Sequence, residues 1–230
     1  MDRLETSLEE KAKMLKSIPS RLCNEFVDVI STDHLDQVKA AAALKIAELL
    51  DILRIDHRND SNMKETPQRV ASMLIDELLV GRFSLPPEIT EFENKLSANE
   101  LIVVGPIEVR SMCAHHMMPI YGSAFVGVLP NPDGRIAGLS KFDRAVHYFS
   151  ARLQVQEELV TQIGQFLAEK TNPRGLAVRI SAVHMCRTHR GVRGSHDGKM
   201  ITNYYYGAML EDHALRVEFQ QHCLSLGRSS

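Results

Sequence analysis

The sequence lacks the features that define several large classes of protein. It has only four cysteines and a formal net charge of −2. A near-neutral chain is not expected to be a general nucleic-acid binder, because such binders usually carry a basic domain. No apolar run approaches the ~20 residues that cross a bilayer, so no membrane partner is expected. The first residues also lack the apolar core of a secretory signal.

The remaining composition is that of a globular chain. Its 230 residues are 44% apolar and 24% charged, enough to bury a core without the help of disulfides. Four cysteines without export features indicate a reducing compartment, where thiols persist. We therefore expect a cytoplasmic protein.

The apolar pattern predicts helices in the N-terminal part of the chain and a mixture of strands and helices in the rest. Apolar residues recur at helical spacing over 34–54, and Thr66-Pro67 predicts the start of a second helix, which ends near Gly81. Two more helices are predicted, one beginning at Ser140 and one ending before Asn172. The predicted strands are 101–109, 120–129, 176–183 and 202–210.

A strand pair, two helices and a second strand pair give an α+β order. We divide the chain into an N-terminal helical region, residues 1–95, and a body of mixed helices and strands, residues 96–230, which holds the motifs described next.

Two segments far apart in the sequence carry candidate metal ligands. Cys113 and His116 form a C-x-x-H pair, and Cys186 supplies a second thiol. Thiolate and imidazole ligands suit zinc, although they also suit other late metals. Three protein ligands leave a position for a water, whose pKa zinc lowers to ~7. Spacing does not decide which imidazole turns inward. The sequence therefore also allows a structural site with four protein ligands, in which His115 joins the other three.

Five ordered motifs around these residues resemble the GTP cyclohydrolase I family, over residues 35–220. They are Cys113-Ala114-His115-His116, Gly138 to Arg144, Gln154-Val155-Gln156-Glu157, His184-Met185-Cys186 and Arg190 to Arg193, with a family-like helix start at Glu65 to Ala71. The resemblance implies the tunnelling fold (T-fold), a barrel subunit with an N-terminal helical extension. Such subunits close into stacked rings, usually a homodecamer with active sites between subunits.

The resemblance also implies a reaction. The family opens the imidazole ring of the guanine of GTP with the help of Zn²⁺, releases formate and forms 7,8-dihydroneopterin triphosphate, which leads to folate-type pterins. Histidine suits proton transfer in such a reaction, because its pKa near ~6.5 lets it donate and accept at neutral pH.

The matching residues take three kinds of role. The metal ligands would be Cys113, His116 and Cys186. The catalytic residues would be His115, His184 and Ser140. The substrate-binding residues would be Gln156 and Glu157 for guanine, and Lys141, Arg144, Arg190 and Arg193 for the triphosphate. A carboxylate selects guanine because adenine lacks its pair of donors, and arginine can grip phosphate with two hydrogen bonds. Without the metal motif nearby, Arg187, Arg190 and Arg193 would be interpreted as a solvated cluster at a strand end.

Two departures from the family pattern affect the functional prediction. Ala114 stands where the family usually has Glu, and residues 194–206, which end in Tyr204 to Tyr206, differ from the family's Ser/Thr-rich strand. Two alternatives therefore stay open. One is a divergent paralogue that acts on another purine nucleotide or stops at the ring-opened formamide. The other is a non-catalytic nucleotide-binding relative.

Overall fold

The computed structural model describes residues 21–27 and 32–227, and the chain divides into two compact units between Leu85 and Pro86. Each unit is described by itself. The structure groups residues 86–95 with the second unit, and the functional division at residue 95 remains a prediction. No helix in the described ranges has both the length and the apolar character needed to cross a membrane.

The first unit contains the predicted helices. α2 spans Thr32–Ile52 and packs against α3, Thr66–Ser72, with Leu50 and Ala71 among the buried residues. α3 continues through a π-helical turn, Met73–Leu78, into α4, Val80–Phe83. Glu65, not Thr66, occupies the N-cap position of α3, and no side chain caps it. Pro67 suits the first turn because that turn needs no amide hydrogen from it.

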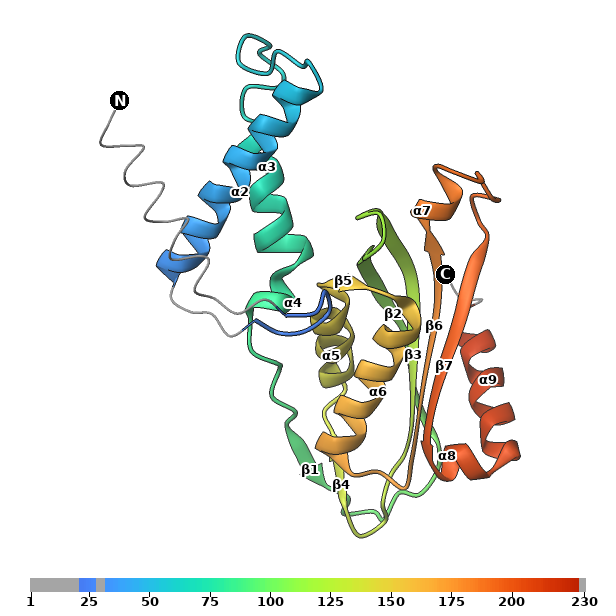
Figure 1. The fold of residues 1–230 in the computed structure, drawn as a ribbon. Coiled ribbons are helices and arrows are strands. Elements are labelled where there is room, and N and C mark those ends of the chain that lie inside the picture. The colour runs from blue at the N-terminus through green and yellow to red at the C-terminus, as the bar shows by residue number, and fades with distance from the viewer. Residues whose placement is uncertain (1–20, 28–31, 228–230) are drawn as a thin grey trace. The chain divides into compact units, whose positions relative to one another are not determined.

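The second unit is built on a five-stranded sheet with the order β5-β2-β3-β6-β7 (Figure 1). Neighbouring strands are antiparallel, except for the parallel pair β2 and β5. A separate small sheet pairs β1, Glu91–Glu93, with β4, Arg135–Ala137. The strands of the main sheet are β2 (Ile102–Cys113), β3 (Pro119–Leu129), β5 (Leu153–Gln154), β6 (Gly175–His184) and β7 (Lys199–Gly207).

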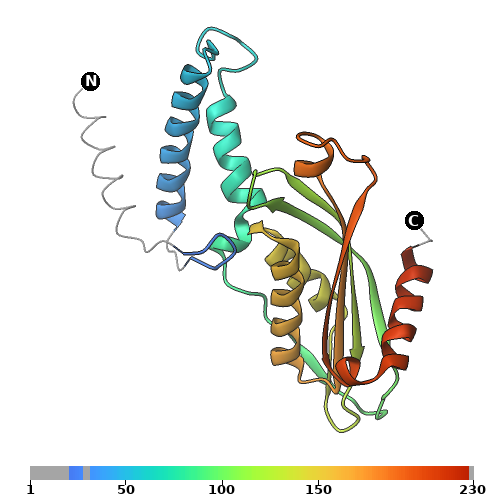
Figure 2. The same cartoon turned by 45° about the vertical axis from the view of Figure 1, so that its right-hand side comes forward.

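Helices cover both faces of this sheet (Figures 1 and 2). α5, Ser140–Ser150, and α6, Gln156–Thr171, pack on one face over a large core that includes Val126, Ile163 and Ile180. α9, His213–Gly227, packs on the other face around Phe219. The α+β class predicted from the sequence is confirmed.

The last predicted strand is partly wrong. β7 begins before Thr202 and ends at Gly207, and the next residues form the short helix α8, Ala208–Glu211. Gly207 has φ +55°, a left-handed conformation that ends the strand and that glycine adopts readily. The sequence pattern did not predict α9, because Phe219 and Cys223 are its only buried side chains among the described residues.

The connections place two sets of predicted residues at opposite ends of the main sheet. β2 ends at Cys113 and β6 ends at His184, and the pairing of Ile120 with His184 brings these strand ends together. We call this the cysteine end. At the opposite end, Leu129 pairs with Gly175, and α5 begins at Ser140 beside a cavity of about 220 Å³ lined by residues that include Val128 and Phe142. We call this the serine end.

Candidate active site

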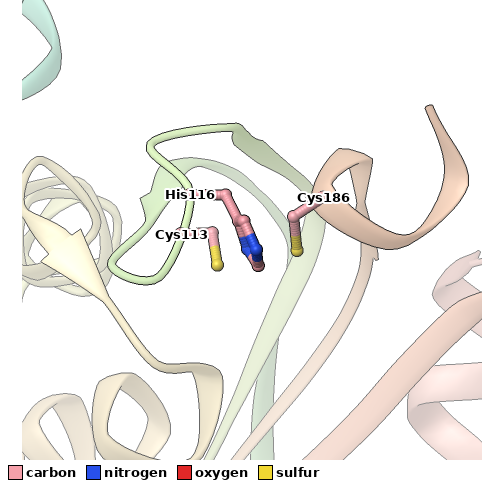
Figure 3. Close-up of side chains that lie close together, drawn as sticks. All are labelled: Cys113, His116 and Cys186. Carbon is pink, nitrogen blue, oxygen red and sulfur yellow. The ribbon is translucent and has the colours of Figure 1, made fainter. Parts of the chain in front are cut away.

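Three predicted metal ligands meet at the cysteine end. Cys113 closes β2, His116 lies in the turn between β2 and β3, and Cys186 lies in the short helix α7, Met185–Thr188. One ligand atom from each residue lies within 4.8 Å of the other two, and Figure 3 shows the side chains converging. Cys113 is buried, Cys186 is half-buried and His116 is exposed. The cluster therefore opens toward solvent on its histidine side.

Local backbone geometry explains this convergence. The Cys113 amide donates to Met118 O at 2.8 Å, and the Met117 amide donates to Cys113 O at 2.8 Å. These bonds close a tight turn, in which Met117 takes a left-handed φ of +51°. A turn of this length brings the C-x-x-H pair onto one side of the chain. The single turn of α7 then presents Cys186 from the end of the neighbouring strand β6.

The donor set fits a divalent metal such as zinc. Burial raises the pKa of the Cys186 thiol, and its hydrogen bond to Cys113 and the charge of Cys113 raise it further. The Cys186 thiolate is therefore disfavoured unless a cation lies beside it, and a bound metal supplies that charge. Arg190 Nη1 lies 3.0 Å from His116 Nε2. Because arginine only donates, this nitrogen of His116 accepts the hydrogen bond in the structure, and a metal bound through the same nitrogen would replace it.

His115 is not part of the converging group. Its Nδ1 lies 3.9 Å from Cys113 Sγ, and its side chain is exposed. The structure thus brings together the three predicted ligands and leaves His115 beside them. This arrangement favours an open three-ligand site over the closed four-ligand alternative.

His184 lies on the adjacent strand end, and Gln156 holds its ring. His184 Nε2 lies 2.7 Å from Gln156 Oε1. Burial lowers the pKa of His184, the charge of Glu157 raises it and the charge of Arg187 lowers it. The net shift is downward, so the environment favours the neutral imidazole.

Three predicted substrate-binding residues lie at the same end of the sheet as this cluster. Glu157 is exposed in the first turn of α6, directly after the buried Gln156. Arg190 reaches His116 from the loop that follows α7. Arg193 lies exposed in the same loop, with φ +47°. The cysteine end therefore combines candidate metal ligands, two histidines, a carboxylate and cations.

Ser140, Lys141 and Arg144 lie elsewhere. They occupy the first half of α5, whose opposite end leads into β5 beside Cys113. The 11 residues of α5 span about 16 Å at 1.5 Å per residue. Within one chain, the structure therefore does not bring Ser140 and Lys141 to the cysteine cluster. Figure 1 shows α5 beside α6, with β5 at one end of the pair and β4 toward the other.

The tyrosines of the divergent segment also point away from this cluster. The register pairs Tyr204 with Val178 and Tyr206 with Leu176, toward the serine end of β6. Tyr204 packs directly on Gly164 of α6, where an added Cβ would clash with its ring. Within one chain, these residues form part of the core and the sheet edge, and they do not line the cysteine cluster.

The sequence analysis missed one contributor to this end. The hydroxyl oxygen of Thr202, on β7, accepts a hydrogen bond from Gln156 Nε2 at 3.1 Å. Only the strand register reveals this contact, since no local motif in the sequence marks Thr202 as a partner of α6.

Comparison with known proteins identifies the family. The family model described as GTP cyclohydrolase I matches residues 41–224. GTP cyclohydrolase 1 of Thermobifida fusca is 38% identical over 84% of this chain and 90% of its own. GTP cyclohydrolase 1 of Streptococcus agalactiae is 41% identical over 71% and 86%, and that of Vibrio campbellii is 34% identical over 93% and 97%.

Among solved structures, an archaeosine synthase QueF-Like in the apo form matches 47% of this chain and 93% of its own, with a TM-score of 0.37 and 14% identity. That likeness is too low to support an argument. The match to the family model covers most of the chain, including all of the predicted site residues. The sheet flanked by helices agrees with the T-fold of that family. The chain belongs to the GTP cyclohydrolase I family.

Proposed function

We propose that the protein is a zinc-dependent GTP cyclohydrolase I that hydrolyses the guanine imidazole ring of GTP, releases formate and forms 7,8-dihydroneopterin triphosphate. The observation that carries the proposal is the convergence of Cys113, His116 and Cys186 within 4.8 Å of one another, with His184 on the adjoining strand end. Family membership supports the choice of GTP as substrate.

Zinc held by Cys113, His116 and Cys186 would act as a Lewis acid and lower the pKa of a water for attack on the purine. His115 is exposed beside the ligands and can exchange protons with both solvent and substrate. His184 is half-buried and neutral by environment, so it can accept a proton and return it as C–N bonds break. The family role proposed for Ser140, shared with His184, lies in the later sugar rearrangement and ring closure.

Glu157 is the proposed guanine anchor. Its carboxylate is exposed at the start of α6, one residue after the glutamine that contacts His184. A carboxylate there can accept the guanine N1–H and amino hydrogens, and a base without those donors would leave the carboxylate unpaired. This interaction would hold the ring beside the metal.

The triphosphate requires cations from both ends of the sheet. Arg190 and Arg193 lie at the cysteine end, whereas Lys141 and Arg144 lie on α5. Since α5 begins at the serine end, a second copy of the chain must supply its residues if they act on the same substrate. β7 pairs only with β6 within the described residues, and a free strand edge is a template for pairing with another chain. We therefore propose a ring-shaped homo-oligomer, a decamer by family resemblance, with shared active sites.

The thiol ligands require a reducing compartment, which supports the proposed cytoplasmic location. The decisive test of function is to incubate zinc-loaded protein with GTP and follow formate release together with pterin fluorescence. Release of both products is expected. Formate without pterin, or a ring-opened formamide alone, would identify the divergent paralogue, and GTP binding without any product would identify the non-catalytic relative.

A further inference from the structure

Gln156, the first residue of α6, makes protein contacts through both ends of its carboxamide. Its side chain is 1% exposed. Its Nε2 lies 3.1 Å from Met200 O, 3.1 Å from Thr202 Oγ1 and 3.3 Å from Ile180 O. Its Oε1 lies 2.7 Å from His184 Nε2. One buried amide thus joins α6, β6, β7 and a proposed proton-transfer histidine.

The chemistry of these neighbours fixes the orientation of the amide. Backbone carbonyl oxygens only accept hydrogen bonds, so the side of Gln156 that faces Ile180 and Met200 must be its NH₂ group. A flipped amide would set one oxygen against two others. The amide oxygen therefore faces His184, and a contact of 2.7 Å requires a hydrogen on His184 Nε2.

This constraint selects one form of the imidazole. A neutral histidine carries a single ring hydrogen, and here that hydrogen lies on Nε2. His184 Nδ1 then keeps its lone pair, and it has no hydrogen-bond partner among residues 21–27 and 32–227. Nδ1 is thus the nitrogen left to exchange a proton with a ligand.

We propose that Gln156 is a positioning residue that fixes the tautomer and the ring orientation of His184, so that proton exchange with substrate occurs at Nδ1. This inference rests on the proposed function, in which His184 moves protons. It also gives Gln156 a different role from the direct guanine contact predicted from the sequence. The buried side chain of Gln156 faces the sheet, whereas the exposed side chain of Glu157 remains available to the base.

The chain offers a matched control for this role. Gln154 is also a fully buried glutamine, and its Nε2 donates to Phe149 O at 2.7 Å and lies 3.0 Å from Gln162 Oε1. These two partners are a backbone carbonyl and a second glutamine, so neither is a histidine. A substitution there removes a comparable buried amide without removing the acceptor of His184.

We therefore compare Gln156→Met with Gln154→Met, both zinc-loaded and tested for an unchanged oligomer size. Gln156→Met should lower kcat by ~10 to 100-fold, the usual effect of removing a group that orients a metal-site imidazole, with KM for GTP changed by less than about threefold. Gln154→Met should lower thermal stability and leave kcat close to the parent value. A rise in KM with an unchanged kcat would show direct substrate contact and overturn the proposal, as would equal kcat in the two variants.

A second measurement needs neither turnover nor a variant of Gln156. Nitrogen-15 chemical shifts of labelled histidine distinguish the two tautomers, and the His184 signal is identified as the one lost in His184→Ala. At pH 8, the wild-type signal should be that of the Nε2–H form. A hydrogen on Nδ1 would overturn the proposal. If the wild-type protein releases no formate from GTP, the proposed function fails, and this measurement still decides the tautomer.

Discussion

The two ends of the sheet differ in how completely one chain assembles them. At the cysteine end, the candidate ligands converge, Arg190 reaches His116, and Gln156 holds His184. At the serine end, the side chains of Ser140 and Arg144 are exposed and make no hydrogen bond or ion pair within the described part of the chain. The side chains of the cysteine end already contact one another within one chain, whereas these two side chains of the serine end make no such contact. This contrast is expected if each complete site takes one end from each of two subunits.

The largest expected effect comes from removing a ligand at the cysteine end. Cys113→Ser, His116→Ala and Cys186→Ser should each lose bound zinc, because each removes one of three ligands, and turnover should fall to background. Metal analysis of the purified protein, paired with a formate assay, measures both. Cys223→Ala is the control, since burial raises the pKa of that thiol to about 11 and makes it a poor ligand. Full zinc retention in all three ligand variants would remove the metal assignment.

The next effect separates proton transfer from metal binding at the same end. His115→Ala and His184→Ala should keep zinc and nucleotide affinity and lose ~100 to 10,000-fold in kcat, the range typical of general acid–base groups. His222→Ala is the matched control, because this half-exposed histidine belongs to α9, and α9 packs on the face of the sheet opposite α5 and α6 (Figure 2). Parent-like turnover of either variant would make that residue a packing histidine. Loss of zinc in His115→Ala would favour the closed structural site.

Substitutions at the serine end should change KM for GTP, whereas those at the two histidines change kcat. Lys141→Ala and Arg144→Ala each remove a cation that would bind phosphate, and hydrogen bonds to charged groups contribute about 1.5–3 kcal/mol. KM for GTP should therefore rise by about 10- to 100-fold, with zinc content unchanged. Lys170→Ala, near the end of α6, removes a similar charge and should leave KM unchanged. An unchanged KM in both α5 variants would place the triphosphate elsewhere.

The smallest effect concerns the residue next to Cys113. Ala114→Glu would restore the carboxylate usual in the family, and activity on GTP should stay equal or rise, because an added carboxylate can orient a neighbouring imidazole. Formate release from GTP, dGTP, GDP, ITP and ATP measures the outcome. Robust wild-type turnover confined to GTP would exclude the divergent paralogue. Poor wild-type turnover of GTP that Ala114→Glu does not improve would support it.

Local sequence information was enough for the parts of the molecule that short motifs determine. The C-x-x-H pair and Cys186 identified the ligand group that the structure brings together. Helical spacing identified α2, and β-branched runs identified β2, β3 and β6. In each case, the signal lies within one element or one turn.

The rest depends on register and packing between distant segments. The pairing of Ala182 with Met200 and of Ile180 with Thr202 places two partners around Gln156, and nothing near Gln156 in the sequence reveals them. Sequence alone also left the choice between His115 and His116 open, because the turn that includes Met117 determines which imidazole faces the cysteines. The separation of Ser140 from Cys113 follows from the direction of α5, which no motif encodes.

The central claim is that one site combines the cysteine end of one subunit with the serine end of another. Its most direct test is to coexpress a cysteine-end variant, His184→Ala, with a serine-end variant, Lys141→Ala combined with Arg144→Ala. The two chains carry different affinity tags, so that mixed oligomers can be purified. Assayed with GTP well below the raised KM of the serine-end variant, random mixing in a ring with head-to-tail contacts should restore about a quarter of wild-type activity, because only one of the four subunit pairings rebuilds an intact site. Activity of the mixed oligomers no higher than that of the parent variants would show that both ends act within one chain and would contradict the account.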